Sequence, residues 1–259
     1  MVMKARLRTD KLWVSYNDHT VLKGIDAAIP DGHFTAIIGA NGCGKSSLLK
    51  SIINLIRPAA GSVTLDGCSI TNMRPSELAR NVAMLPQAPI APEGITVAEL
   101  VARGRFAWQS FFPRYSLKDH EAVATALSAT RLEGLADKLL SELSGGQRQR
   151  AWIAMVLAQD TQIILLDEPT SFLDLSHQVE LMQLLVRLRK QGKTIVAVLH
   201  DINQACRYAD NLIALADGRV IAAGSPGEIL SPALVEEVFG LKVMVASDPV
   251  SGTPMAVAL

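Results

Sequence analysis

The sequence has few cysteines and no long apolar run. Its three cysteines, Cys43, Cys68 and Cys206, are odd in number and far apart, which offers neither a disulfide framework nor metal-ligand spacing. No run approaches the roughly 18 consecutive apolar residues of a membrane span, and the first residues lack an apolar signal core. We therefore expect a chain that folds around its own hydrophobic core in a reducing compartment.

An excess of charge of either sign is also missing. The 25 Lys and Arg residues balance the 25 Asp and Glu residues. Proteins that grip nucleic acid chiefly through its phosphates are usually basic, so this balance disfavours a nucleic-acid partner. The partners of this chain are expected among proteins and small anions.

The pattern of apolar residues indicates an α/β protein. With 259 residues, 49% of them hydrophobic, the chain can build a substantial core. Residues 4–38 read as strands, and between about 90 and 160 the pattern turns helical, with capping boxes at Thr96/Glu99 and Ser116/Asp119. From residue 163 strands and helices alternate again, which predicts a parallel core interrupted by a helical insert. The later elements are expected at 163–166, 176–190, 194–199, 201–208, 212–216, 219–222 and from 232 to 239.

One glycine-rich loop carries the clearest chemical signal. It follows the β-branched run 34–38 and opens into an apolar helical segment. Strand, glycine loop, Lys-Ser and helix form a phosphate-binding P-loop, in which glycines let backbone N–H groups converge on an anion at a helix N-terminus. Lys45 would reach the β- and γ-phosphates of a nucleoside triphosphate, and the Ser46 hydroxyl would ligate Mg²⁺. The loop reads Gly39, Ala40, Asn41, Gly42, Cys43, Gly44, Lys45, Ser46 and Ser47.

Two adjacent carboxylates end a second apolar strand. Residues 163–166 are followed by Asp167 and Glu168. In a P-loop protein, an Asp at a strand end can hold the Mg²⁺ that bridges the phosphates. The next residue, Glu168, can polarise an attacking water. Without a P-loop, the same pattern would be an ordinary strand end.

A second Ser-Gly turn precedes a helix. Ser144, Gly145, Gly146 and Gln147 place backbone N–H groups at a helix N-terminus, as an anion-binding nest would. The simpler alternative is a loop with an N-capping serine.

These motifs together, in this order, resemble the ATP-binding cassette (ABC) ATPases over nearly the whole chain. The resemblance implies a P-loop NTPase (RecA-like) core with an antiparallel β subdomain and an inserted α-helical subdomain. It implies one ABC ATPase domain over 1–259, with a catalytic core at about 1–88 and 160–259 and a helical subdomain at about 89–159.

The resemblance also assigns roles to single residues. Tyr16 would stack on adenine, although packing alone would also place an aromatic at a strand end. Gln87 is similar to the glutamine that touches Mg²⁺ or water, and His200 to the histidine that contacts the γ-phosphate. Asp174 would belong to the D-loop, in which Phe172 departs from the more usual small residue.

The mechanism implied by the resemblance is a two-fold dimer with ATP and Mg²⁺ as cofactors. Each ATP would lie between the 39–47 loop of one copy and the 144–147 turn of the other. Glu168 would activate water, and hydrolysis would reopen the dimer. A regulatory module without catalysis is disfavoured because Glu168 and His200 are both present.

One cassette without a membrane span suggests a subunit that docks on a separate permease at the cytoplasmic face of a bacterial inner membrane. Five of the twelve aromatics lie in 106–115, beside Arg103, Arg105 and Arg114, and form either a docking surface or the core of the helical insert.

The substrate class also follows from resemblance. Residues 147–160, 198–205 and 248–255 are similar to importers of ferric siderophores and ferric citrate, which receive substrate from a periplasmic binding protein. Haem and cobalamin importers are the alternative within the class. A soluble ABC ATPase acting on ribosomes or DNA is a more distant one, since paired cassettes and long coiled coils are missing.

Overall fold

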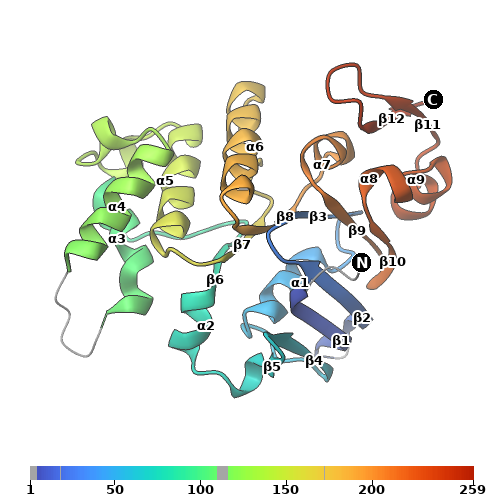
Figure 1. The fold of residues 1–259 in the computed structure, drawn as a ribbon, viewed down its shortest axis with the longest axis horizontal. Helices are drawn as coiled ribbons and strands as arrows, with labels where there is room; N and C mark the ends of the chain where they lie inside the picture. Colours follow the sequence, from blue (N-terminus) through green and yellow to red (C-terminus); the bar gives the residue numbers. More distant parts are fainter. Residues whose placement is uncertain (1–4, 18, 110–115, 172) are drawn as a thin grey trace. The chain divides into compact units, whose positions relative to one another are not determined.

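A computed structural model describes residues 5–17, 19–109, 116–171 and 173–259 (Figure 1). The chain divides into two compact units, Met1–Met73 with Leu185–Leu259, and Arg74–Leu184. The P-loop NTPase architecture predicted above is confirmed by its parts, which are described unit by unit. The division into a catalytic core and an insert at 89–159 stays a prediction.

The first unit contains an antiparallel sheet. Its strand order is β2-β1-β4-β5, and each neighbouring pair is antiparallel. Leu7, Leu12 and Val14 of β1 are buried, while the residues between them are mostly exposed, as the period of two of a half-buried strand requires. The register shifts near Lys11, which takes a φ of 41°. The strands are β1 (Ala5–Tyr16), β2 (His19–Pro30), β4 (Ala60–Leu65) and β5 (Cys68–Ser69).

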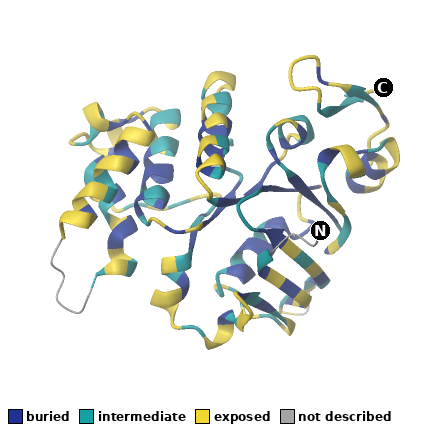
Figure 2. Ribbon diagram, in the orientation of Figure 1, coloured by how far each residue is buried: buried dark blue, intermediate teal, exposed yellow. Residues whose placement is uncertain are grey.

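The same unit contains parallel strands. β3 pairs in parallel with β8 on one side and with β9 on the other, and β10 pairs antiparallel with β9. Every residue of β3 and β8 is buried (Figure 2), which explains why both sequences are mostly apolar. The strands are β3 (Phe34–Gly39), β8 (Thr194–Val198), β9 (Asn211–Ala216) and β10 (Arg219–Gly224), and helix α1 (Lys45–Ile52) follows β3.

Near the C-terminal end of the first unit, hydrogen bonds join a β-hairpin to helix α7. The Asn203 side chain donates to Ala256 O (3.0 Å) and accepts from Ala256 N (2.8 Å), and Arg207 Nε donates to Asp248 Oδ2 (2.8 Å). The hairpin and the short helix α8 were absent from the sequence-based expectations. The elements are α7 (Ile202–Tyr208), α8 (Pro226–Ile229), α9 (Pro232–Phe239), β11 (Val243–Ser247) and β12 (Pro254–Ala258).

The second unit is mainly helical around two parallel strands, β6 and β7. Both predicted capping boxes are confirmed, Thr96 with Glu99 and Ser116 with Asp119. The elements are α2 (Pro75–Asn81), β6 (Val82–Leu85), α3 (Val97–Ala102), α4 (Leu117–Ala129), α5 (Gly145–Ala158), β7 (Ile163–Asp167) and α6 (Leu175–Lys190), whose last residues belong to the first unit. Short 3-10 turns lie at Ile70–Asn72 in the first unit and at Arg103–Trp108, Glu133–Leu135 and Leu140–Glu142.

The aromatic and Arg-rich stretch is in part a core. Arg105 is 6% exposed and donates to Asp119 Oδ1 and to Ala158 O, both at 2.8 Å. The Trp108 indole donates to Gln159 O (2.7 Å), and the Arg105 guanidinium lies 5.3 Å from its ring centre. Of the two alternatives left open by the sequence, the structure supports the core for Arg105. Phe106 is 79% exposed, and Phe111, Phe112, Arg114 and Tyr115 lie outside the described residues.

Within the described ranges, no helix combines the length and the apolar character that crossing a bilayer requires.

Candidate nucleotide-binding site

The P-loop has a backbone that only glycine permits at two points. Gly39 takes a φ of 154°, and a Cβ there would lie 2.2 Å from the carbonyl oxygen of Leu215. Gly44 takes a φ of 107°, and its Cβ would lie 2.5 Å from a methyl group of Leu22. The loop is therefore wedged between β9 and β2, and its shape is set before any ligand arrives.

Lys45 lies inside this loop. Its side chain is buried, and Nζ donates to Gly39 O (2.9 Å) and Ala40 O (2.8 Å). No acidic side chain lies in the first turn of α1, so the helix N-terminus keeps its partial positive charge. The ammonium and the N-terminal N–H groups of α1 together can receive a polyanion.

Cys43 does not have the surroundings of a reactive thiol. Burial raises the pKa of the Cys43 thiol, and the nearby Lys45 ammonium only partly offsets this. A protonated, buried thiol is a poor nucleophile, so Cys43 acts as a small side chain beneath the loop.

Two further predicted residues of the first unit meet the loop region. The Tyr16 hydroxyl lies 3.3 Å from Ser47 Oγ on α1, while 44% of the residue is exposed and leaves ring surface open for stacking. His200 is exposed and follows Leu199, whose N–H donates to Ile37 O on β3 (3.1 Å). Because β8 and β3 are parallel, His200 lies at the same sheet edge as the P-loop.

The second unit brings Gln87 and Glu168 together. Leu85 of β6 and Leu166 of β7 are paired, so the residues that follow them emerge at one edge. Gln87 Nε2 donates to Glu168 Oε2 at 2.6 Å. Asp167, the last residue of β7, is 1% exposed.

Glu168 has an unusual backbone. Its φ of 52° is in the left-handed region, which costs a non-glycine residue about 1–2 kcal/mol. Ser171 Oγ donates to the same carboxylate oxygen at 3.2 Å, and Ser171 N donates to Glu168 O. The side-chain bonds from Ser171 and Gln87 fix the direction of the carboxylate. Backbone strain of this kind is typical of functional positions.

The 144–147 turn caps helix α5. Gln147 N donates to Ser144 Oγ (3.3 Å), and Ser144 N donates to Gln147 Oε1 (3.0 Å). The N-capping alternative is therefore present in the structure. Because Gly145 and Gly146 carry no side chains, the turn keeps open backbone at the helix N-terminus, and its anion-binding role stays a prediction.

Asp174 caps helix α6. Its Oδ1 accepts from Ser176 Oγ (2.8 Å), His177 N (2.9 Å) and His177 Nδ1 (2.8 Å). These bonds, led by the His177 N–H, lower the pKa of Asp174 to about 2. Sequence reasoning missed His177, and it placed Ser171 in the D-loop without anticipating its bond to Glu168. The Asp-x-x-His spacing was the available signal for His177, since residues three apart share a helix face.

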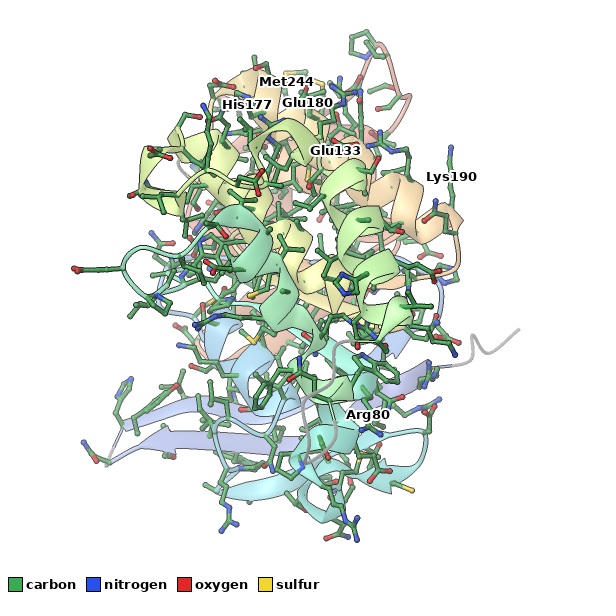
Figure 3. All side chains as sticks on the ribbon, turned by 90° about the vertical axis from the view of Figure 1, so that its left-hand side faces the viewer. Arg80, Glu133, His177, Glu180, Lys190 and Met244 are labelled. Atoms are coloured by element: carbon green, nitrogen blue, oxygen red, sulfur yellow. The ribbon has the colours of Figure 1, made fainter. Side chains whose placement is uncertain are left out.

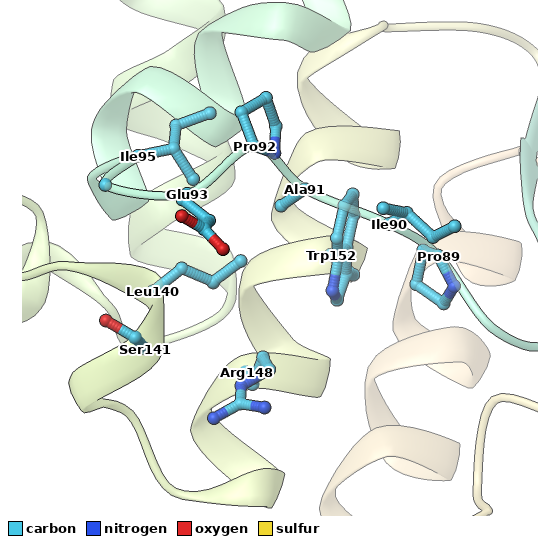
Figure 4. A pocket seen from close by; sticks show the side chains of 11 residues that line it. Pro89, Ile90, Ala91, Pro92, Glu93, Ile95, Leu140, Ser141, Arg148 and Trp152 are labelled. Carbon is cyan, nitrogen blue, oxygen red and sulfur yellow. The ribbon is translucent and has the colours of Figure 1, made fainter.

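An apolar cavity of about 360 Å³ lies in the second unit. Trp152 projects from α5 toward the segment that follows Gln87, with Arg148 one turn away (Figure 4). Sequence reasoning did not single out this cavity, although two prolines mark the segment. Its lining is Pro89, Ile90, Ala91, Pro92, Glu93, Gly94, Ile95, Leu140, Ser141, Arg148 and Trp152.

Comparisons with known proteins agree with these features. The family profile described as "ABC transporter" matches residues 22–171. The ferric enterobactin transport ATP-binding protein FepC of Escherichia coli (strain K12) is 54% identical over 98% of this chain and 94% of its own length. The petrobactin import ATP-binding protein FpuD of Bacillus anthracis is 47% identical over 98% of this chain and 94% of its own length.

A solved structure is similar in fold over most of the chain. The bacterial ABC transporter cassette MJ0796, solved as a dimer, is 31% identical with a TM-score of 0.76, covering 85% of this chain and 98% of that one. The same cassette has been solved in a dimeric post-hydrolysis state bound to ADP and Pi, with a TM-score of 0.75.

Proposed function

The chain is an ATPase of the ABC transporter family, and from this we propose that it powers uptake of an iron(III)-siderophore or ferric citrate through a separate bacterial permease. The observation that carries the substrate class is the similarity to siderophore importers along nearly the whole chain. Haem and cobalamin importers remain the alternative, because no side chain of an ATPase subunit needs to touch the cargo.

The 39–47 loop is the proposed phosphate site. Backbone N–H groups between Gly39 and Ser47 and the Lys45 ammonium would hold the triphosphate. The half-exposed ring of Tyr16 would stack on adenine. The support is the preformed loop, in which the ammonium already lies beneath the position that an anion would take.

Mg²⁺ fits the available oxygen donors. Ser46, Asp167 and Gln87 offer hard oxygen ligands, and the phosphates would complete the coordination. No cluster of three or more His, Cys, Asp or Glu side chains suited to a metal occurs in the part of the chain that the structure describes, so a protein-only cage is not expected there. When bound, Mg²⁺ would neutralise charge on the phosphates.

Hydrolysis would depend on three side chains at the strand ends. Glu168, held by Gln87 and Ser171, would orient and polarise the attacking water. Gln87 would sense the γ-phosphate, because binding there competes with its bond to Glu168. His200 would contact the γ-phosphate from the edge of β8.

The second half of each ATP site would come from a second copy of the chain. The 144–147 turn and Asp174 of that copy would close over the triphosphate, so that ATP stabilises a homodimer and hydrolysis releases it. The dimeric structure of MJ0796 supports the homodimer.

The apolar cavity is the proposed docking site for the permease. A short apolar helix of an integral-membrane subunit would fit against Trp152 and the 89–95 segment. This places the protein at the cytoplasmic face of the bacterial inner membrane, with a periplasmic substrate-binding protein as an indirect partner. The position of the cavity directly after Gln87 offers a route from docking to catalysis.

Uptake measurements test the proposal. Cells lacking this protein should lose accumulation of one radiolabelled ferric chelate from a panel of siderophores and citrate, and a plasmid copy should restore it. A plasmid carrying Glu168→Gln should not restore it, which separates ATP hydrolysis from mere assembly. Unchanged uptake of every ferric chelate, with haem or cobalamin uptake lost, would overturn the substrate class.

A further inference from the structure

We infer that His177 is a positioning residue, which holds the 144–147 turn in place relative to the loop that carries Asp174. The inference rests on the proposed function, because those two segments are the proposed contribution of one copy to the ATP site of the other. About 30 residues separate the two segments along the chain, so contacts between side chains must fix their relative positions.

One side of the imidazole is fixed by Asp174. His177 Nδ1 lies 2.8 Å from Asp174 Oδ1, and since a carboxylate can only accept, Nδ1 carries the proton and donates. His177 N donates to the same oxygen. His177 lies on α6, three residues before Glu180 (Figure 3), and 31% of its side chain is exposed. The ring is thus oriented by its own helix cap.

The same ring, at Nδ1 and the atoms beside it, also meets Gly146. A Cβ placed on Gly146 would lie 3.2 Å from His177 Nδ1 and 3.3 Å from its Cγ, so the ring already occupies the space next to this glycine. Gly146 is in the first turn of α5, directly after the Ser144 cap. The bare glycine therefore lets one ring touch both segments at once.

A second bond joins the same two segments. Gln149 Nε2 donates to Pro169 O at 3.0 Å, one turn further along α5 and next to Glu168 in the chain. The first two turns of α5 are therefore held at two points, by Gln149 near Glu168 and by His177 near Asp174. With both contacts present, the turn and Asp174 move together, so a second copy presents them to ATP as one surface.

Amide hydrogen exchange on the nucleotide-free protein tests the inference directly. The Gln147 and Arg148 amides, which donate to Ser144, report on the turn. In His177→Ala they should exchange about tenfold faster, the size expected for losing a hydrogen bond to a carboxylate. The amides of β7 should be unchanged, which shows that the variant folds. Ser176→Ala removes another bond to Asp174 Oδ1 without touching Gly146 and serves as the matched control.

Replacements that keep one contact each refine the test. His177→Asn retains a donor near the Nδ1 position but loses the ring, whereas His177→Phe retains the ring but loses the donor. Since the ring contacts Gly146 only when the donor orients it, both should exchange about as fast as His177→Ala. Wild-type exchange rates in the turn of His177→Ala would overturn the inference.

ATP-driven dimerisation links the inference to function. In a Glu168→Gln background, adding His177→Ala should raise the ATP concentration for half-maximal dimer by about tenfold. Binding of ATP to the monomer should stay within about twofold, because the P-loop is unaltered. Failure of the Glu168→Gln protein itself to dimerise would contradict the proposed function. Equal dimerisation with and without His177, in a background that does dimerise, would contradict the inference alone.

Discussion

The predicted site residues of the first unit and those of the second unit are held in place by different means. In the first unit the P-loop is shaped by its backbone, with two glycines pressed against neighbouring strands and a lysine buried among the loop carbonyls. In the second unit, Gln87, Glu168, Ser171, Asp174 and His177 are held by side-chain hydrogen bonds. A rigid half suits tight capture of the ligand, and a half built of exchangeable bonds suits a step that must respond to hydrolysis.

The largest expected effect comes from breaking the backbone of the first half. Gly39→Ala would place its Cβ 2.2 Å from Leu215 O, so β3, β9 or the loop must shift. We expect the free energy of unfolding to fall by at least about 3 kcal/mol, with loss of ATP binding. Urea unfolding and ATP titration measure both.

Gly32→Ala is the matched control for this variant. Gly32 also has a positive φ, of 68°, but no atom lies within 4 Å of a Cβ built there. Its cost should be about 1 kcal/mol, with ATP binding retained. Equal losses in the two variants would show that φ alone, and not the contact with Leu215, fixes the loop.

Glu168→Gln should abolish most ATP hydrolysis and leave ATP binding intact. ATP turnover should fall by at least about 100-fold, since general bases contribute about 10²–10⁴-fold, while ATP binding and ATP-dependent dimerisation persist. Steady-state phosphate release and size-exclusion chromatography with ATP measure the two effects. Undiminished turnover would remove Glu168 from its proposed role.

Ser171→Ala tests whether the orientation of Glu168 matters. It deletes the 3.2 Å bond to Glu168 Oε2 and leaves the shorter bond from Gln87 in place. We expect turnover to fall about fivefold without a change in the affinity for ATP. A change in affinity with unchanged turnover would contradict a role confined to the second half.

The smallest effect is expected for Asp174→Asn, and it concerns how the stability of the fold depends on pH in acid. Because its pKa is lowered from 3.8 to about 2 in the folded protein, its charged form stabilises the fold above pH 4, and this contribution fades as the pH falls toward 2. Asp174→Asn keeps a helix-capping side chain but no charge. The difference in urea midpoint between Asp174→Asn and wild type should be constant from pH 5 to 7 and shrink below about pH 4. A difference that grows in acid would contradict this assignment.

Local signals in the sequence predicted the elements that depend on local chemistry. Thr96 and Ser116 begin helices because their hydroxyls cap nearby N–H groups, and such caps can be recognised within four residues. The P-loop was equally readable, since its glycines and Lys45 are contiguous. Its role followed from residue types alone.

Contacts between residues far apart in the sequence could not be predicted from motifs and apolar periodicity. The Gln87–Glu168 bond joins residues 81 positions apart, and only the family resemblance placed both at one site. The C-terminal hairpin was missed because its fastening, Asn203 to Ala256, spans 53 positions. The sequence left open whether Arg105 lies in a docking surface or in a core, because its partners Asp119 and Ala158 could not be assigned to it from spacing.

The bonds of Lys45 have a consequence for how a ligand is selected. Its ammonium has three N–H donors, and two of them already donate to carbonyl groups of the loop, so a phosphate meets a donor group that is partly occupied. If the ammonium exchanges a carbonyl for a phosphate oxygen, the net binding free energy is small for a small, weakly charged anion such as inorganic phosphate. A triphosphate should bind more tightly because its additional oxygens also accept hydrogen bonds from the neighbouring backbone amides. We therefore expect the loop to discriminate by the length of the polyanion, in addition to its charge.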